Sequence, residues 1–185
     1  MQAVLLVHGA YGSPQSNWQP WLSGMLSKKN CRVLEPQFPT PHGQSLDNWL
    51  EIFEPYRKPL GDSCIAVGHS IGATFLLSVL ERQKSNAAFL VSGFISQIGI
   101  ERFDKINATF FKKEFDWNAI KSNCKNIHII HGDDDPYVPL SKAYEISEKL
   151  GCEVTVVKGG GHFSTSTTPG YDKFQFLLDE IMKEI

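Results

Sequence analysis

The sequence predicts a three-layer α/β sandwich, in which a six-stranded, mainly parallel sheet carries helices on both faces. Six short runs rich in Val, Ile, Leu and Phe recur along the chain, and such near-continuous hydrophobicity is typical of parallel strands buried on both faces. The segments between these runs have the length and apolar spacing of helices, which implies right-handed crossovers on an open sheet. The expected strands are residues 4–7, 31–35, 64–67, 88–91, 127–130 and 154–157.

The expected helices carry their apolar residues on one face, which we expect to pack on the sheet. Residues 71–80, 140–150 and 171–185 complete the alternation, and Gly151 stands where a helix end favours a left-handed residue. Residues 96–123 mix aromatic and basic residues, and their pattern does not distinguish helix from loop. A small lid could form from this segment. Two apolar faces are clearest: Trp18, Trp21, Leu22, Met25 and Leu26, then Trp49, Ile52, Phe53 and Tyr56.

Length and composition favour one domain over residues 1–185, located in the cytoplasm. A chain of 185 residues is long enough to bury one continuous core. The net charge of -2, with both signs interspersed, disfavours nucleic acid and anionic membranes as partners. The N-terminus lacks the features of a signal peptide, no apolar stretch reaches the ~20 residues of a membrane span, and four scattered cysteines indicate reduced thiols. The oligomeric state is not readable.

The strongest motif is a G-x-S-x-G run from Gly68 to Gly72, with Ser70 at its centre. It directly follows an expected strand and directly precedes an expected helix, as a nucleophile elbow does. That turn is so tight that side chains at Gly68 and Gly72 would clash, and the helix N-terminus favours negative charge nearby. We therefore expect Ser70 to be a nucleophile; the alternative is a serine that only caps the helix.

Three carboxylates, Asp133, Asp134 and Asp135, follow the strand at 127–130. We expect one of them to orient a catalytic base. Pro136 biases Asp135 towards an extended conformation, which gives that side chain a fixed direction. The alternative is that all three are turn residues or cap the following helix.

The expected base is His162, in a glycine-rich loop after the last strand. Proteins with a nucleophile elbow have the chain order nucleophile, acid, base, and His162 is the only histidine after these aspartates. The alternative is an ordinary surface histidine. The serine, a carboxylate and the imidazole would then meet beyond the carboxyl ends of the strands, where open α/β sheets bind ligands.

The loop after the first strand is the expected source of an oxyanion hole. If that strand lies beside the one before Ser70, the backbone N–H groups of Ala10 and Ile71 can bind a developing oxyanion. We expect His8 to support this loop rather than to react. Tyr11 and Phe163 are the expected residues of the substrate pocket.

Together these residues resemble the α/β-hydrolase superfamily, and within it the small cap-less YdeN-like serine hydrolases related to retinoblastoma-binding serine hydrolase. The resemblance covers nearly the whole chain and rests on these runs: His8-Gly9, Trp18-Gln19-Pro20-Trp21-Leu22, Gly68-His69-Ser70-Ile71-Gly72, Asp134-Asp135-Pro136 with Val138-Pro139, and Gly161-His162-Phe163. It implies a minimal hydrolase core without the superfamily's first two antiparallel strands. It also implies Asp135 as the acid, and weak esterase activity on short acyl chains.

The expected function is hydrolysis of a small-molecule acyl substrate, an ester or thioester, through an acyl-enzyme on Ser70. This chemistry requires no cofactor and no metal. Two alternatives remain open. One is a binding or scaffold protein that keeps the fold without turnover. The other is a metal site, which strand alternation disfavours because the side chains would not converge; its residues would be His128, His131, Asp133 and Asp135.

Overall fold

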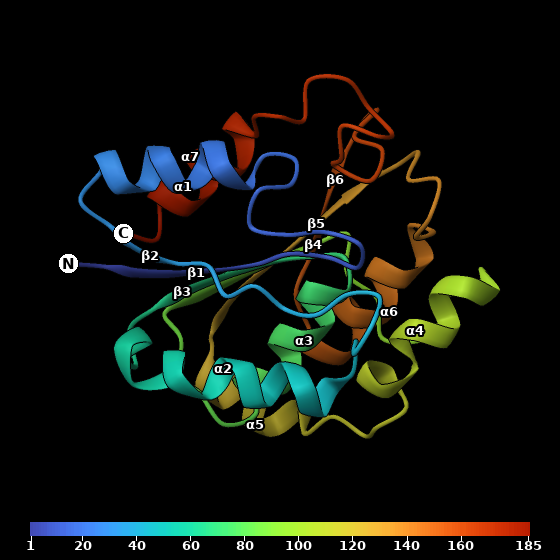
Figure 1. Cartoon of the computed structure of the whole chain (residues 1–185), viewed down its shortest axis with the longest axis horizontal. Coiled ribbons are helices and arrows are strands. Elements are labelled where there is room, and N and C mark those ends of the chain that lie inside the picture. The colour runs from blue at the N-terminus through green and yellow to red at the C-terminus, as the bar shows by residue number, and fades with distance from the viewer.

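A parallel sheet of six strands forms the middle layer of the protein, which a computed structural model describes over residues 1–185 (Figure 1). The strand order is β2-β1-β3-β4-β5-β6, and every neighbouring pair is parallel. We expected a mainly parallel sheet, and the observed one is parallel throughout. The strands are β1 (Ala3–Val7), β2 (Arg32–Leu34), β3 (Ile65–His69), β4 (Ala87–Val91), β5 (Asn126–Gly132) and β6 (Val154–Val157).

Helices cover both faces of the sheet, so the predicted three-layer α/β sandwich is confirmed. In Figure 1, α1 and α7 lie on one face, and α2, α3, α5 and α6 lie on the other, with α4 near the ends of the strands. The helices are α1 (Gln19–Lys28), α2 (Leu46–Leu60), α3 (Ile71–Leu80), α4 (Glu101–Phe111), α5 (Trp117–Asn123), α6 (Ser141–Leu150) and α7 (Gln175–Met182).

Each face of the sheet buries its own hydrophobic core. Successive side chains of a strand point to opposite faces, so Leu5 and Ala66 join the core under α2 and α3. Their neighbours Leu6 and Val67 join the core under α1 and α7. Helix α3 is buried along its whole length, because it lies between the sheet and the outer helices. This burial fixes the start of α3, and with it the turn that carries Ser70.

Two elements differ from the sequence prediction, and the structure also decides a segment that the sequence left ambiguous. The edge strand β6 leaves Thr155 and Val156 exposed, since no helix covers them, although its apolar sequence indicated full burial. Residues 96–123 form two helices, α4 and α5. The last helix begins at Gln175, because the preceding aromatic residues pack into the core under α7 instead of continuing the helix.

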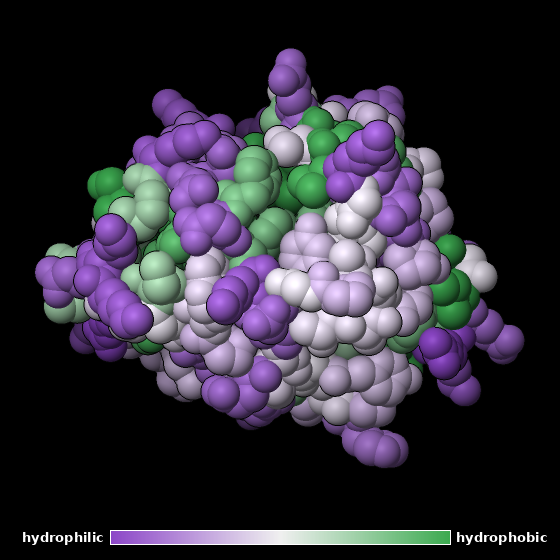
Figure 2. All heavy atoms as spheres, turned by 90° about the horizontal axis from the view of Figure 1, so that it is seen from above, coloured by the Kyte–Doolittle hydropathy of each residue, from purple (hydrophilic) through white to green (hydrophobic).

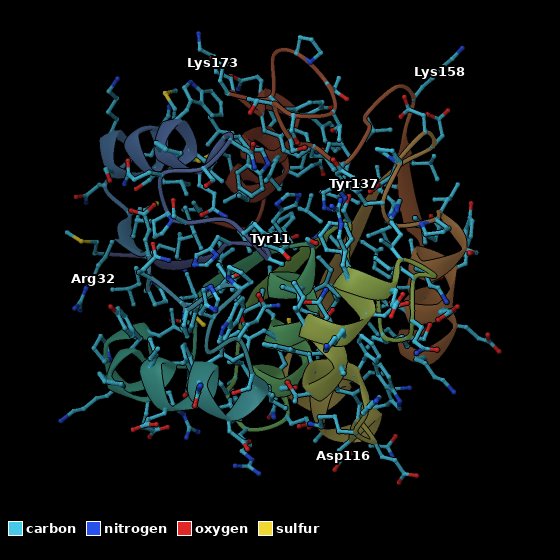
Figure 3. All side chains as sticks on the ribbon, turned by 45° about the vertical axis from the view of Figure 1, so that its right-hand side comes forward. Tyr11, Arg32, Asp116, Tyr137, Lys158 and Lys173 are labelled. Carbon is cyan, nitrogen blue, oxygen red and sulfur yellow. The ribbon has the colours of Figure 1, made fainter.

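The carboxyl ends of the strands meet at one edge of the sheet, and the loops that follow them surround a common space. Tyr11, after β1, and Tyr137, after β5, both lie near the middle of this edge in Figure 3, whereas Lys158 and Lys173 lie at the periphery. Seen from above, hydrophilic side chains are dispersed over the surface, and hydrophobic ones gather in small groups between them (Figure 2). None of the helices combines the length and apolar character needed to cross a membrane.

Candidate active site

Ser70 occupies a strained turn between β3 and α3. Its backbone has φ 57° and ψ -125°, a left-handed conformation that L residues rarely adopt. The glycines of the motif make the turn possible: a Cβ on Gly68 would lie 2.5 Å from the carbonyl oxygen of Gly72, and one on Gly72 would lie 2.5 Å from that of His8. The Ser70 N–H donates to the carbonyl of Val91 (2.8 Å), which ties the turn to β4. The hydroxyl is thereby directed to the carboxyl edge of the sheet.

His162 and Asp135 are joined by a short hydrogen bond. The distance from His162 Nδ1 to Asp135 Oδ2 is 2.7 Å, and the Asp135 side chain is fully buried. Its Oδ1 accepts from the N–H groups of Tyr137 (2.9 Å) and Val138 (3.0 Å). Burial alone would raise the pKa of Asp135, but the hydrogen bond and charge of His162 and these two N–H groups outweigh it and lower the pKa. The carboxylate therefore stays ionised and fixes the ring, with Nε2 left to face the cavity.

The other two aspartates hold the loop that carries His162. Asp133 Oδ1 accepts from the N–H of Gly159, and Asp134 Oδ1 accepts from the N–H of Gly161, both at 2.7 Å. Neither carboxylate contacts the imidazole, and α6 begins without a side-chain cap. The three adjacent acids therefore have three different hydrogen-bond partners, which the sequence did not distinguish.

Two long-range contacts that the sequence did not predict also pin this loop. His69 Nε2 lies 2.8 Å from the carbonyl oxygen of His162, and Trp18 Nε1 donates to the carbonyl of Phe163 (3.0 Å). Burial, aided by the charge of His162, lowers the pKa of His69 to about 3. The neutral His69 ring must therefore carry its proton on Nε2 and donate it to the carbonyl. His69 stands inside the G-x-S-x-G run, and that position was the only available signal for its role.

The loop after β1 lies against Ser70, as the pairing of β1 with β3 requires. A Cβ on Gly9 would lie 3.0 Å from Ser70 Cβ, a tighter contact than most side chains make, so glycine favours this approach. His8 Nδ1 donates to the Gly9 carbonyl (2.9 Å), and its Nε2 accepts from the N–H of Phe38 (3.0 Å). Burial lowers the pKa of His8 despite the bond to Gly9, so the ring is neutral. It supports the loop, as the sequence led us to expect.

The two expected oxyanion donors lie on either side of the serine turn. Ala10 lines the same cavity as Ser70, and Ile71 is the first residue of α3. The first N–H groups of a helix have no partner within the helix. The role of these two N–H groups as oxyanion donors stays a prediction.

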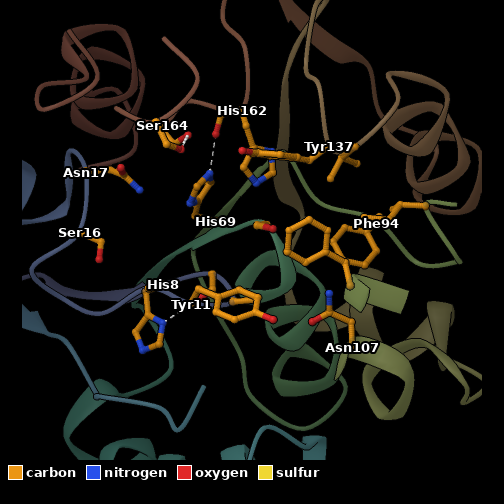
Figure 4. A pocket seen from close by; sticks show the side chains of 18 of the residues that line it. His8, Tyr11, Ser16, Asn17, His69, Phe94, Asn107, Tyr137, His162 and Ser164 are labelled. Carbon is orange, nitrogen blue, oxygen red and sulfur yellow. Dashed lines mark hydrogen bonds between the residues drawn. The ribbon is translucent and has the colours of Figure 1, made fainter. Parts of the chain in front are cut away.

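A cavity of about 280 Å³ lies beside Ser70 and His162. Figure 4 shows His162 near its middle, with Tyr137 on one side and Asn17 on the other. Ser70 and His162 both line this cavity, and the structure contains no hydrogen bond between the serine hydroxyl and the imidazole. Such bonds are often long in unliganded enzymes and tighten when substrate binds.

Of the two expected pocket residues, Tyr11 lines the cavity and Phe163 does not. The assignment of Phe163 was wrong, because its backbone turns through φ 48° and directs the ring into the core. There it is fully buried and stacks on Phe174, with ring centroids 4.8 Å apart. The segment 96–123 contributes to the wall through Ile98, Phe103 and Asn107. The other side chains that the sequence did not reveal are Ser16, Asn17, Gln19, Phe94, Tyr137, Val138, Ser164 and Ser166.

The four residues of the metal alternative do not all converge. His131 Nε2 lies 3.6 Å from Asp135 Oδ2, but Asp133 and His128 have other partners. His128 Nε2 lies 2.9 Å from Glu184 Oε1, near the C-terminus, and its ring stacks on Phe89. His131 points to the other side of β5, where its Nε2 donates to the carbonyl of Val138 (2.9 Å). No group of three or more histidine, cysteine, aspartate or glutamate side chains has the arrangement of a metal site.

A parallel sheet flanked by helices, with a serine on a strained turn after β3 and a histidine after β6, defines the α/β-hydrolase class of proteins. All six strands of the sheet are parallel, so the sheet has no antiparallel strands beyond the predicted minimal core. The chain belongs to the serine hydrolase family, whose model matches residues 4–179.

Relatives of known sequence and structure agree with this assignment. The chain is 28% identical to the YdeN hydrolase of Bacillus subtilis (strain 168) over 165 residues, which cover 86% of this chain and 85% of the relative. It is 26% identical to the serine hydrolase RBBP9 of Rattus norvegicus over 150 residues, covering 80% and 79%. The crystal structure of the ydeN gene product superposes with a TM-score of 0.88 at 25% identity, covering 100% of this chain and 98% of the other.

Proposed function

We propose that this hydrolase is a serine esterase that cleaves small carboxylic esters or thioesters through an acyl-enzyme on Ser70. The observation that carries the proposal is the 2.7 Å bond between His162 and Asp135, at the wall of the cavity that Ser70 also lines. A hydroxyl is a weak nucleophile, and an adjacent imidazole held by a buried carboxylate is the arrangement that activates it.

The proposed reaction has two halves. In the first, Ser70 Oγ forms a bond to the substrate carbonyl carbon while His162 Nε2 takes the hydroxyl proton. The carbonyl oxygen becomes negative and accepts from the N–H groups of Ala10 and Ile71. His162 then protonates the departing alcohol or thiol, and the acyl group remains on Ser70. In the second half, water loses its proton to His162 and attacks the acyl carbon, which releases the acid and restores the serine.

Asp135 supports both halves without taking a proton. Its lowered pKa keeps it ionised, so it holds the Nδ1–H of His162 and stabilises the imidazolium that forms in each half. Each oxyanion donor is worth roughly 100- to 1000-fold in turnover in enzymes of this kind. The proposed substrate is a small molecule, since the cavity of about 280 Å³ is at the lower end of ligand sites.

We also propose a reducing, cytoplasmic location. Its support is the set of four cysteines, none of which is in a disulfide bond. Burial raises the pKa of the Cys64 and Cys124 thiols, which favours the unreactive protonated form.

Hydrolysis of short nitrophenyl esters by four variants tests the proposal. Ser70→Ala and His162→Ala are expected to lower turnover by roughly four to six orders of magnitude, as deletions within a triad do. The exposed residues Ser27 and His42 supply matched controls, so Ser27→Ala and His42→Ala should retain wild-type turnover. A loss below tenfold in the first pair would mean that the wrong residues are named and would overturn the proposal. Absence of turnover in the wild type would favour the non-catalytic scaffold.

A further inference from the structure

The cavity beside Ser70 has two chemically different sides. In Figure 4, His69 and His162 separate two groups of side chains. On one side lie Ser16, Asn17 and Ser164, and on the other lie Phe94 and Tyr137. None of the residues that line the cavity is an aspartate, glutamate, lysine or arginine. A charged ligand would therefore lose its hydration without gaining an ionic partner, so the cavity favours an uncharged one.

Aromatic rings line one side in an unbroken series. Tyr11 contacts Phe103 edge to face (6.0 Å between centroids), Phe103 contacts Tyr137 (5.7 Å), and Tyr137 contacts His162 (5.2 Å). The ring of Tyr11 is 55% exposed, which leaves apolar surface open to a ligand. Asn107 also lines this side, and its Oδ1 accepts from Gln44 Nε2 (2.6 Å). Burial of an aryl or similarly bulky apolar group against these rings would be favourable.

The wall of the cavity also contains an amide with an unmet hydrogen bond. Gln19 lines the cavity and is only 3% exposed, yet its Oε1 is buried and has no hydrogen-bond partner. Such groups are rare in folded proteins, because losing water without a replacement donor is costly. Because Oε1 itself is not exposed to the cavity, the amide must turn for this vacant acceptor to meet a donor that comes with a ligand.

Asn17, two residues earlier, adds a donor on the side of the cavity away from Phe94 and Tyr137 (Figure 4). Its Oδ1 accepts from both the N–H and the hydroxyl of Thr165, each at 3.1 Å. These two donors fix the orientation of the amide, so Nδ2 points towards the cavity (Figure 4). A hydroxyl group can accept from such an N–H and donate to an amide oxygen. The side chains of Asn17 and Gln19 together therefore suit a hydroxyl-bearing group.

We infer that the substrate is an uncharged ester that joins an aromatic or bulky apolar group to a hydroxyl-bearing group, with Gln19 accepting from a substrate hydroxyl. The inference rests on the proposed esterase function, because the two sides flank Ser70. The apolar part binds along Tyr11, Phe103 and Tyr137, and the hydroxylated part binds beside Asn17 and Gln19. The scissile carbonyl then lies between them, at the serine.

Two matched pairs of esters test this substrate class. In the first pair, 2,3-dihydroxypropyl benzoate is compared with propyl benzoate, so the hydroxyls are on the alcohol. In the second, benzyl glycerate is compared with benzyl propionate, so the hydroxyls are on the acyl group. The measured quantity is the ratio of kcat/KM within each pair, in wild type and in Gln19→Leu. The intrinsic reactivity of each ester cancels between the two proteins.

Gln19→Leu is expected to lower that ratio about tenfold in one of the two pairs, which is the contribution of one neutral hydrogen bond. The affected pair also identifies which part of the ester binds beside Gln19. The variant should fold, because leucine has a similar volume and removes a buried acceptor without a donor. Gln15→Leu, an exposed position in the same segment, should leave both ratios unchanged. Phe103→Ala should lower kcat/KM for 2,3-dihydroxypropyl benzoate more than for the acetate.

The failures are distinguishable. Wild-type ratios in Gln19→Leu, with turnover retained, would overturn the hydroxyl-binding role and leave the esterase function standing. Hydrolysis of nitrophenyl esters but of none of these esters would overturn the substrate class alone. Absence of Ser70-dependent turnover on every ester would overturn both.

Discussion

Protonation of His69 is expected to destabilise the fold as the pH falls, and the size of the effect follows from its burial. The ring is 5% exposed, and burial, with the charge of His162, lowers its pKa from 6.5 to about 3. The unfolded chain therefore binds a proton near pH 6.5 that the folded protein does not bind until about pH 3. Stability from this group is complete above pH 6.5 and is lost as the pH falls through this window. Between pH 7.5 and pH 5 the loss amounts to about 2 kcal/mol.

His69→Gln isolates this contribution, because glutamine does not titrate and retains an N–H donor for the His162 carbonyl. Urea unfolding followed by tryptophan fluorescence gives the free energy of unfolding of both proteins at each pH. Burial also lowers the pKa values of His8 and His131, so both proteins should lose stability towards pH 5. The wild type is expected to lose about 2 kcal/mol more than the variant. Equal losses in the two proteins would refute the assignment of His69 as a buried, neutral donor.

Three further predictions test the turn, the acid and the core. Gly68→Ala should destabilise the fold by about 3 kcal/mol or more, because its Cβ would lie 2.5 Å from a backbone oxygen. Gly24→Ala, whose Cβ would have nothing within 4 Å, should stabilise the fold. Thermal unfolding compares the two variants, and similar shifts in melting temperature would contradict the steric account. Asp135→Asn should lower ester kcat about 10⁴-fold by favouring the wrong imidazole tautomer. In Asp133→Asn the amide oxygen can still accept from the backbone, so kcat should fall less than tenfold. Equal losses of kcat would mean that the wrong acid is named. Phe163→Ala should lower the free energy of unfolding by about 3–5 kcal/mol without changing the preference for acyl-chain length. A changed preference with intact stability would show that Phe163 lines the pocket after all.

The sequence predicted the features that depend on local pattern. Buried strands read as continuous apolar runs, and the tight turn at Ser70 requires glycines at fixed offsets, so both were visible without a structure. The prediction of His162 as the base used its place after the aspartates in the chain. The sequence predicted more burial for β6 than the structure has, because an apolar run does not indicate that its strand lies at the edge of the sheet.

The features that the sequence did not reveal depend on long-range contacts or on one backbone angle. Residues alone left three adjacent aspartates as candidates, and the family resemblance implied Asp135. The fold joins Asp135 to the imidazole and the other two aspartates to the loop. The contact between His69 and the carbonyl of His162 joins residues 93 positions apart. Phe163 follows His162 directly, and a positive φ sends its ring to the opposite side. The local motifs therefore predicted the serine hydrolase family, whereas they did not predict which side chains line the pocket.

The most direct test of the central claim is to incubate the protein with a fluorophosphonate at neutral pH and to locate the adduct by mass spectrometry. The account predicts one adduct per chain, on Ser70, and its loss in His162→Ala. An unmodified Ser70 in the folded wild-type protein, or labelling that persists at full rate without His162, would contradict the claim that these residues form a nucleophile and its base.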